Sequence, residues 1–183
     1  FSDTICPWCY VGAKRVEQFS ELFDVEVKWW PFELHPETPP DGRHIDELMA
    51  PNNPRRVAMR DHLKNIAAES ELELVSNRTV ANSHLALEAA EFARDRGKFK
   101  EMHDALFKAY FTEAKNIGDM DVVTEIVTAV GLDADEWRAE SASGRYAELI
   151  DFATSVARKQ GISSTPTMVF DDRFVVQGAQ DLN

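Results

Sequence analysis

The spacing of apolar residues changes along this chain, and the change sets the expected order of its secondary structure. Through the middle of the chain apolar residues recur at three- and four-residue steps, most clearly at Phe99, Met102 and Leu106, which predict one face of a helix. Near the end, two strand-like runs cover residues 167–170 and 173–176, with two aspartates between them. The sequence therefore predicts a mostly helical chain that ends in a β-hairpin.

Caps and breakers mark the other predicted elements. Four prolines and one glycine between His35 and Asn53 predict a long irregular loop, and Gly161 suits the left-handed cap that ends a helix. The predicted helices cover residues 9–22, 54–71, 83–97, 98–110, 119–131, a short stretch from 133, and 146–160, and strands are predicted at the start of the chain and over residues 25–32. The order is strand, helix, strand, helical block, helix and hairpin.

Size and charge narrow the classes of function. With 183 residues, 44% of them hydrophobic, the chain is long enough to bury the core of one domain. A net charge of -12 repels phosphate backbones and anionic lipids, so neither nucleic acid nor membrane is an expected partner. The chain opens at Phe1 without a methionine, which predicts that the natural chain begins earlier and leaves an export signal open.

The chemistry-bearing motif is Cys6-Pro7-Trp8-Cys9, which contains both cysteines of the chain and precedes a helical pattern. A disulfide across this short loop cannot staple a fold. A thiol at a helix N-terminus has a lowered pKa, so we expect Cys6 to be the nucleophile and the deeper Cys9 to resolve the mixed disulfide. Pro7 suits the first helical position, and Trp8 is expected either to offer an apolar surface to a substrate or to pack on a neighbouring loop.

No metal ion is expected at this motif. A closed zinc site needs four ligands, and none of the five histidines pairs with another at zinc-finger spacing. His103 falls in the apolar stripe of its predicted helix and is interpreted as a hydrogen-bonded core residue.

Two segments, residues 1–12 and 161–170, resemble the FrnE-like branch of the DsbA family of thiol-disulfide oxidoreductases. The resemblance implies an α/β, thioredoxin-like fold with an inserted all-helical subdomain. Residues 1–34 and 145–183 would form a discontinuous core, and residues 35–144 a helical insertion that includes the proline-rich loop. Trp8 stands where the best-known members have histidine, which argues against a very strong oxidant, and the FrnE-like branch implies a cytoplasmic protein.

The resemblance also implies that Pro166 is a cis-proline facing the dithiol. A peptide bond before proline is the one that can adopt the cis form at a small cost in free energy. Thr165 and Pro166 would then bind an extended peptide or glutathione by strand addition, next to Pro7 and Trp8. The expected partners are protein or low-molecular-weight thiols and disulfides, with a thiol system that recycles the enzyme. No cofactor is expected beyond the Cys6-Cys9 disulfide, and glutathione is a possible co-substrate.

Two alternatives stay open. The same fold serves 2-hydroxychromene-2-carboxylate isomerases and kappa-class glutathione transferases, in which a serine replaces the first cysteine, here Cys6. A second alternative is a chaperone or binding module that uses the apolar surface around Trp8 and the proline-rich loop, with the cysteines incidental. Saturable glutathione binding and turnover of a small electrophile would distinguish the first alternative from a protein oxidoreductase. A Cys6→Ser variant that still suppressed aggregation and lost no activity would favour the second.

Overall fold

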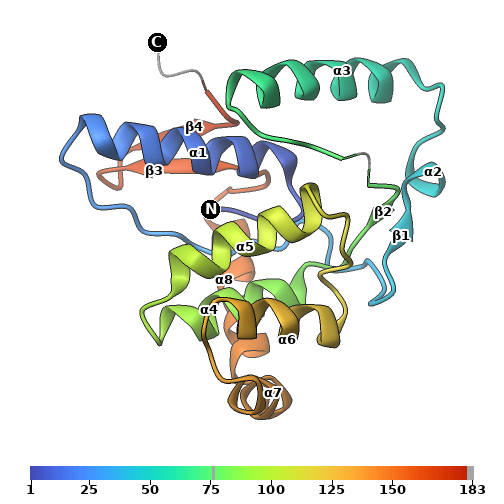
Figure 1. Cartoon of the computed structure of the whole chain (residues 1–183). Helices are drawn as coiled ribbons and strands as arrows, with labels where there is room; N and C mark the ends of the chain where they lie inside the picture. The colour runs from blue at the N-terminus through green and yellow to red at the C-terminus, as the bar shows by residue number, and fades with distance from the viewer. Residues whose placement is uncertain (76, 181–183) are drawn as a thin grey trace.

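The computed structural model describes residues 1–75 and 77–180, and within these residues it contains eight helices and four short strands (Figure 1). The helices are α1 (Pro7–Leu22), α2 (Ile45–Leu48), α3 (Pro54–Glu69), α4 (His84–Arg94), α5 (Phe99–Phe111), α6 (Met120–Ala129), α7 (Ala134–Ser143) and α8 (Arg145–Lys159). The strands are β1 (Arg43–His44), β2 (Thr79–Val80), β3 (Thr167–Phe170) and β4 (Phe174–Gln177). Every predicted helix is present, with ends that shift by no more than three residues.

Side-chain caps explain where several helices begin. Asn53 accepts a hydrogen bond from the backbone of Arg55 at the start of α3, and Asp133 accepts one from Glu136 at the start of α7. Just after the C-terminal end of α8, Gly161 has φ +84°, the left-handed conformation that the sequence predicted. The local signals of these helix ends are therefore enough to place them.

The terminal hairpin is confirmed, but its loop is longer than predicted. Phe170 pairs with Phe174, so the loop contains three residues, 171–173, and β4 begins one residue later than expected. Asp171 and Asp172 both have positive φ, 50° and 54°, a conformation that aspartate tolerates better than most residues.

The strand predicted over residues 25–32 is wrong. Val25 and Val27 are exposed, so the alternating pattern is not matched by burial, and only Pro31 forms a bridge, parallel to Ser2. Ser2 exchanges backbone hydrogen bonds of 3.0 Å with Trp30 and Phe32. The expected strand at the start of the chain is likewise reduced to this bridge.

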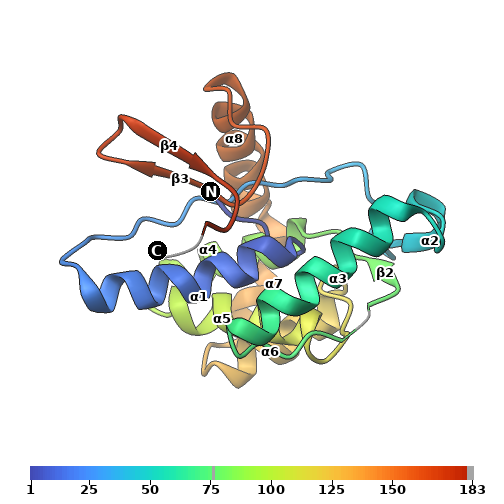
Figure 2. The same ribbon diagram turned by 90° about the horizontal axis from the view of Figure 1, so that it is seen from above.

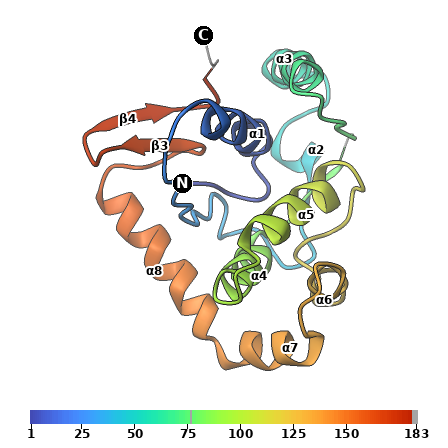
Figure 3. The same ribbon diagram turned by 60° about the vertical axis from the view of Figure 1, so that its left-hand side comes forward.

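The start of the chain also contacts β3. The amino group of Phe1 donates to the Thr167 carbonyl at 2.8 Å, and the Thr167 amide donates to the Phe1 carbonyl at 3.2 Å. Four segments therefore lie side by side and form a short sheet-like layer that flanks α1 (Figure 3). Their spatial order is residues 30–32, residues 1–2, β3 and β4.

The long irregular loop predicted over residues 35–53 is also wrong in part. Between Gly42 and Pro51 the chain contains no helix breaker, and there β1 pairs antiparallel with β2, with Arg43 opposite Val80. His44 then caps the short α2 by accepting a hydrogen bond from the Asp46 amide. Both strands have two residues, too few for an alternating pattern to be seen in the sequence.

The main hydrophobic core lies among α4, α5, α6 and α7 and extends to the start of α1. Its fully buried members include Phe92, Met102, Leu106, Phe107 and Trp137, and Cys6 and Cys9 belong to the same cluster. Helix α8 leads from α7 to β3, and α3 packs on α1 (Figure 2). The dithiol thus lies where the helical block meets the sheet-like layer, while the domain boundaries at residues 34 and 145 stay a prediction.

No helix in the described part of the chain combines the length and apolar character needed to cross a membrane.

Candidate active site

Cys6 is the cap residue of α1, and its backbone begins the helix. It has extended φ and ψ of -86° and 113°, and its carbonyl accepts hydrogen bonds from the amides of Cys9 at 3.0 Å and Tyr10 at 3.2 Å. Pro7 occupies the first helical position, where its missing N–H leaves no partner unsatisfied. The sequence Cys-Pro-Trp-Cys therefore folds into the first turn of a helix, with one thiol before the turn and one inside it.

The two thiols have opposite electrostatic character. Both are buried, with Cys6 5% and Cys9 1% exposed. A hydrogen bond from the Cys9 thiol holds the pKa of Cys6 below its usual range, against the opposing effect of burial, and the Cys9 amide adds to the lowering. Burial, followed by the hydrogen bond to Cys6, raises the pKa of Cys9 well above its usual range. The directions agree with the sequence prediction, but the main cause at Cys6 is the neighbouring thiol.

The Thr165–Pro166 peptide bond is cis and lies against the dithiol. The Cys6 Sγ donates to the Thr165 carbonyl oxygen at 3.4 Å, across a sequence separation of 159 residues. The Pro166 carbonyl in turn accepts a hydrogen bond from the Gly178 amide at 2.8 Å, which ties the loop to the end of β4. The structure therefore brings Cys6, Cys9, Thr165 and Pro166 together, as the resemblance implies.

Gly12 on α1 lets the helix approach this loop closely. A Cβ built at Gly12 would lie 3.3 Å from the Pro166 Cγ, closer than ordinary van der Waals contact. The glycine is buried and helical, so its role is to provide space.

Gly12→Val is expected to slow thiol-disulfide exchange by roughly tenfold to a hundredfold, because the added branches displace Pro166 and with it the Thr165 carbonyl. The rate of reduction of a small disulfide measures the effect. Ala13→Val is the matched control, since it places the same β-branched residue one position along the same helix. Equal rates for the two variants would show that the approach to Pro166 has no part in the reaction.

Trp8 packs against α3. Its ring lies 5.3 Å from the ring of His62, and both Pro7 and Trp8 are half-buried at the border of the dithiol. The packing partner is thus a helix, where the sequence suggested a substrate surface or a neighbouring loop. A substrate role for Pro7 and Trp8 stays a prediction.

Asp3 is a buried acidic residue next to the dithiol that the sequence analysis missed. Its Oδ2 accepts a hydrogen bond from the Leu34 amide at 2.7 Å and its Oδ1 one from the Ile5 amide at 3.2 Å. Burial raises the pKa of Asp3 to about 6, and its negative charge opposes the lowering of the pKa of Cys6. Its backbone amide donates to the Cys9 Sγ at 3.5 Å. The available signal was a lone acid three residues before Cys6.

Comparison with known proteins agrees with this geometry. The model of the DSBA-like thioredoxin domain matches residues 1–183. The chain belongs to this family. The fold predicted from the sequence, a thioredoxin-like fold with a helical insertion, is thereby confirmed.

Individual relatives cover nearly all of this DSBA-like chain. The uncharacterized protein YwbO of Bacillus subtilis is 30% identical over 182 residues, which cover 98% of this chain and 88% of YwbO. The crystal structure of the probable DsbA oxidoreductase SCO1869 from Streptomyces coelicolor has a TM-score of 0.87 at 29% identity and covers 98% of this chain and 82% of its own.

Two more distant solved structures share the fold. A 2-hydroxychromene-2-carboxylate isomerase has a TM-score of 0.78 at 15% identity, with 97% of this chain and 86% of its own covered. The cytosolic disulfide reductase DsbM from Pseudomonas aeruginosa, solved with GSH, has a TM-score of 0.70 at 19% identity, with coverage of 96% and 87%.

Proposed function

We propose that this chain is a thiol-disulfide oxidoreductase of the FrnE-like type that exchanges disulfides with protein or low-molecular-weight thiol substrates. The observation that carries the proposal is the pairing of a thiol of lowered pKa, Cys6, with the carbonyl of Thr165 at 3.4 Å and with a second, buried thiol of raised pKa. Membership of the DSBA-like family supports the same reaction class.

The proposed reaction has two exchange steps. The Cys6 thiolate attacks a substrate disulfide, which forms a mixed disulfide and releases one substrate thiolate. Cys9 then loses its proton and attacks the Cys6 sulfur, which releases the second substrate thiolate and leaves a Cys6–Cys9 disulfide. Two electrons pass from the dithiol to the substrate, and the reverse sequence oxidises a substrate dithiol. The raised pKa of Cys9 keeps it protonated until the mixed disulfide forms.

The substrate would bind along the cis-proline loop. Thr165 precedes the proline, and an extended segment with a backbone donor can pair with it by strand addition when it displaces the hydrogen bond from Cys6. Glutathione contains a peptide backbone of this kind, and DsbM, which shares the fold, was solved with GSH. We therefore include glutathione among the proposed thiol partners and assign recycling of the enzyme to a thiol system. The cytosolic description of DsbM favours the cytoplasm as the compartment.

The test is the redox potential of the Cys6–Cys9 pair in glutathione buffers, measured with the pH dependence of Cys6 alkylation. The rate of Cys6 alkylation is expected to rise with pH, and the midpoint of the rise should lie below the ordinary cysteine pKa of about 8.5. A potential above roughly -230 mV would identify an oxidase or isomerase, and one near about -270 mV a reductase. An unreactive Cys6 of ordinary pKa would overturn the proposal.

A glutathione-dependent isomerase or transferase is the second candidate, favoured by the shared fold of the 2-hydroxychromene-2-carboxylate isomerase. It requires saturable glutathione binding and turnover of a small electrophile, with no net change in the redox state of Cys6 and Cys9. Steady-state assays with glutathione and an electrophile distinguish it from the oxidoreductase, which consumes or forms a disulfide in each cycle.

A further inference from the structure

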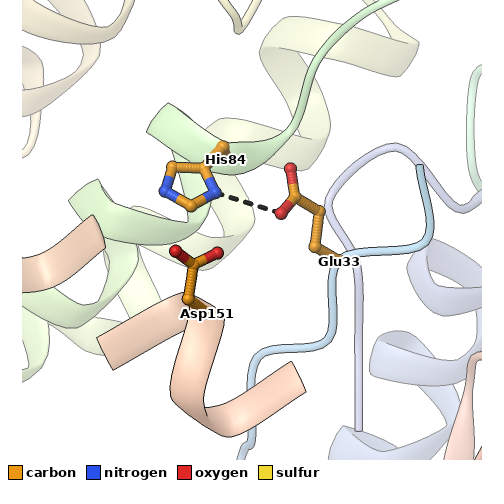
Figure 4. Close-up of side chains that lie close together, drawn as sticks. All are labelled: Glu33, His84 and Asp151. Atoms are coloured by element: carbon orange, nitrogen blue, oxygen red, sulfur yellow. Dashed lines mark hydrogen bonds and ion pairs between the residues drawn. The ribbon is translucent and has the colours of Figure 1, made fainter. Parts of the chain in front are cut away.

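A second cluster of chemically active side chains lies apart from the two thiols. Glu33 follows the segment that bridges to Ser2, His84 is the first residue of α4, and Asp151 lies on α8 (Figure 4). One ligand atom from each of the three residues lies within 4.8 Å of the other two. Three segments far apart in the sequence therefore converge through an imidazole and two carboxylates.

The histidine ring is already oriented within this cluster. Its Nδ1 makes a 3.0 Å hydrogen bond with the Glu33 Oε2, and the Asp151 carboxylate lies beside the ring (Figure 4). Its other nitrogen, Nε2, is 3.8 Å from the Glu88 Oε1. A metal ion in place of the shared proton would be held by the His84 nitrogen and a Glu33 oxygen at once.

Glu88 provides an independent indication of a missing partner. Its side chain is 6% exposed, and its Oε2 is buried without a hydrogen-bond partner within the described residues. Glu33 is equally buried, with a side chain 3% exposed. Buried carboxylate oxygens are normally paired or coordinate a metal, since an unpaired buried charge is costly.

The nearby basic residues do not supply the missing charge. Arg158 lines a pocket together with Glu33 and Asp151, but it donates to the backbone carbonyl of Glu33, at 3.1 Å. Lys159 makes no ion pair with the cluster in the part of the chain that the structure describes. The two carboxylates of Glu33 and Asp151 thus face one imidazole. Even a protonated His84 would leave an excess of negative charge.

We propose that Glu33, His84 and Asp151 form a binding site for a divalent transition-metal ion of the Zn²⁺ class, next to the unpaired carboxyl of Glu88. Imidazole with carboxylate oxygen is a donor set that suits Zn²⁺ and related ions. A pocket of about 430 Å³, lined by Glu33 and Asp151 among others, gives access for the ion and a water ligand. The ion would join the segment at Glu33 to α4 and α8 and stabilise their arrangement.

The sequence alone predicts no metal ion here, because Glu33, His84 and Asp151 stand too far apart in the chain for a local spacing to mark them. This inference does not rest on the redox proposal, since neither cysteine belongs to the cluster.

The experiment is a calorimetric Zn²⁺ titration of chelator-treated protein in the oxidised form, in which the Cys6–Cys9 disulfide removes thiolate ligands. One ion per chain is expected to bind, with a rise in the thermal unfolding midpoint. Co²⁺ titrated in parallel should give weak visible bands without the strong thiolate charge-transfer absorption. Asp151→Asn is expected to weaken binding at least about tenfold, and His84→Ala to abolish it.

The matched control is His35→Ala. His35 forms a similar pair with Glu37, at 3.1 Å, but both side chains are exposed and no third ligand among the described residues joins them, so this variant should bind Zn²⁺ like the unaltered protein. Asp151 is exposed, so its amide variant retains the fold and decides the question even where His84→Ala unfolds. The proposal is overturned if no stoichiometric ion binds, or if Asp151→Asn binds as tightly as the unaltered protein.

Discussion

Replacing Cys6 by serine is expected to reduce disulfide exchange to the uncatalysed rate, while the chain remains folded. Cys6 carries the thiol of lowered pKa and contacts the Thr165 carbonyl, so no other described group can start the attack. Cys9 cannot substitute for it, because it is 1% exposed and its pKa is raised well above the ordinary range. Serine has nearly the same shape and is not a nucleophile toward sulfur at neutral pH. Reduction of a protein disulfide and oxidation of a dithiol peptide measure the loss in both directions.

Cys9→Ser is the matched variant for this prediction. It retains the reactive Cys6 but lacks the thiol that resolves the intermediate, so it should accumulate a mixed disulfide with glutathione. Mass spectrometry would show one glutathione per chain. If Cys6→Ser kept full activity, or if the protein acted only by suppressing aggregation and did so equally well with serine, the binding-module alternative would replace the redox proposal.

The local part of this fold could be predicted from the sequence. Helix starts at Asn53, Asp119 and Asp133 depend on a side chain that accepts a hydrogen bond two or three residues ahead, a signal contained in a few consecutive residues. The position of the dithiol at the start of α1 follows from Pro7 in the same way. The prediction of a strand over residues 25–32 is wrong because alternating apolar and polar residues form a strand only where a neighbouring segment pairs with them. In this segment the pairing is limited to Pro31.

The remainder of the site depends on contacts between distant segments. Asp3 meets the Leu34 amide, and Trp8 meets His62 on α3, and neither contact leaves a local pattern in the sequence. The Thr165–Pro166 loop was found only through the family resemblance, because a proline at the start of a strand has many ordinary explanations. The cluster at His84 lacks even that support, which is why it emerged only from the structure.

The largest expected effect on stability concerns His103 and acid pH. The imidazole is buried between Trp29 and Phe107, with ring centres 4.6 Å away in each case, and burial lowers its pKa to about 3. An unfolded histidine has a pKa of about 6.5, so below that pH the unfolded chain binds a proton that the folded chain excludes. The stability that this neutral histidine contributes is therefore complete above about pH 6.5 and is lost as the pH falls toward 3. Between pH 7 and 4.5 the loss amounts to roughly 2 to 3 kcal/mol.

His103→Leu is expected to remove this loss. Urea unfolding at pH 7 and pH 4.5 should show that the free energy of unfolding of the variant falls by about 2 to 3 kcal/mol less than that of the unaltered protein. Asp3, whose pKa is raised to about 6, acts in the opposite direction, but it is present in both proteins and cancels in the comparison. Met102→Leu is the control, because it alters a buried side chain of the same helix that carries no ionisable proton. An identical pH dependence in His103→Leu and the unaltered protein would mean that His103 is protonated inside the fold, which would require a partner for its charge within the aromatic cluster.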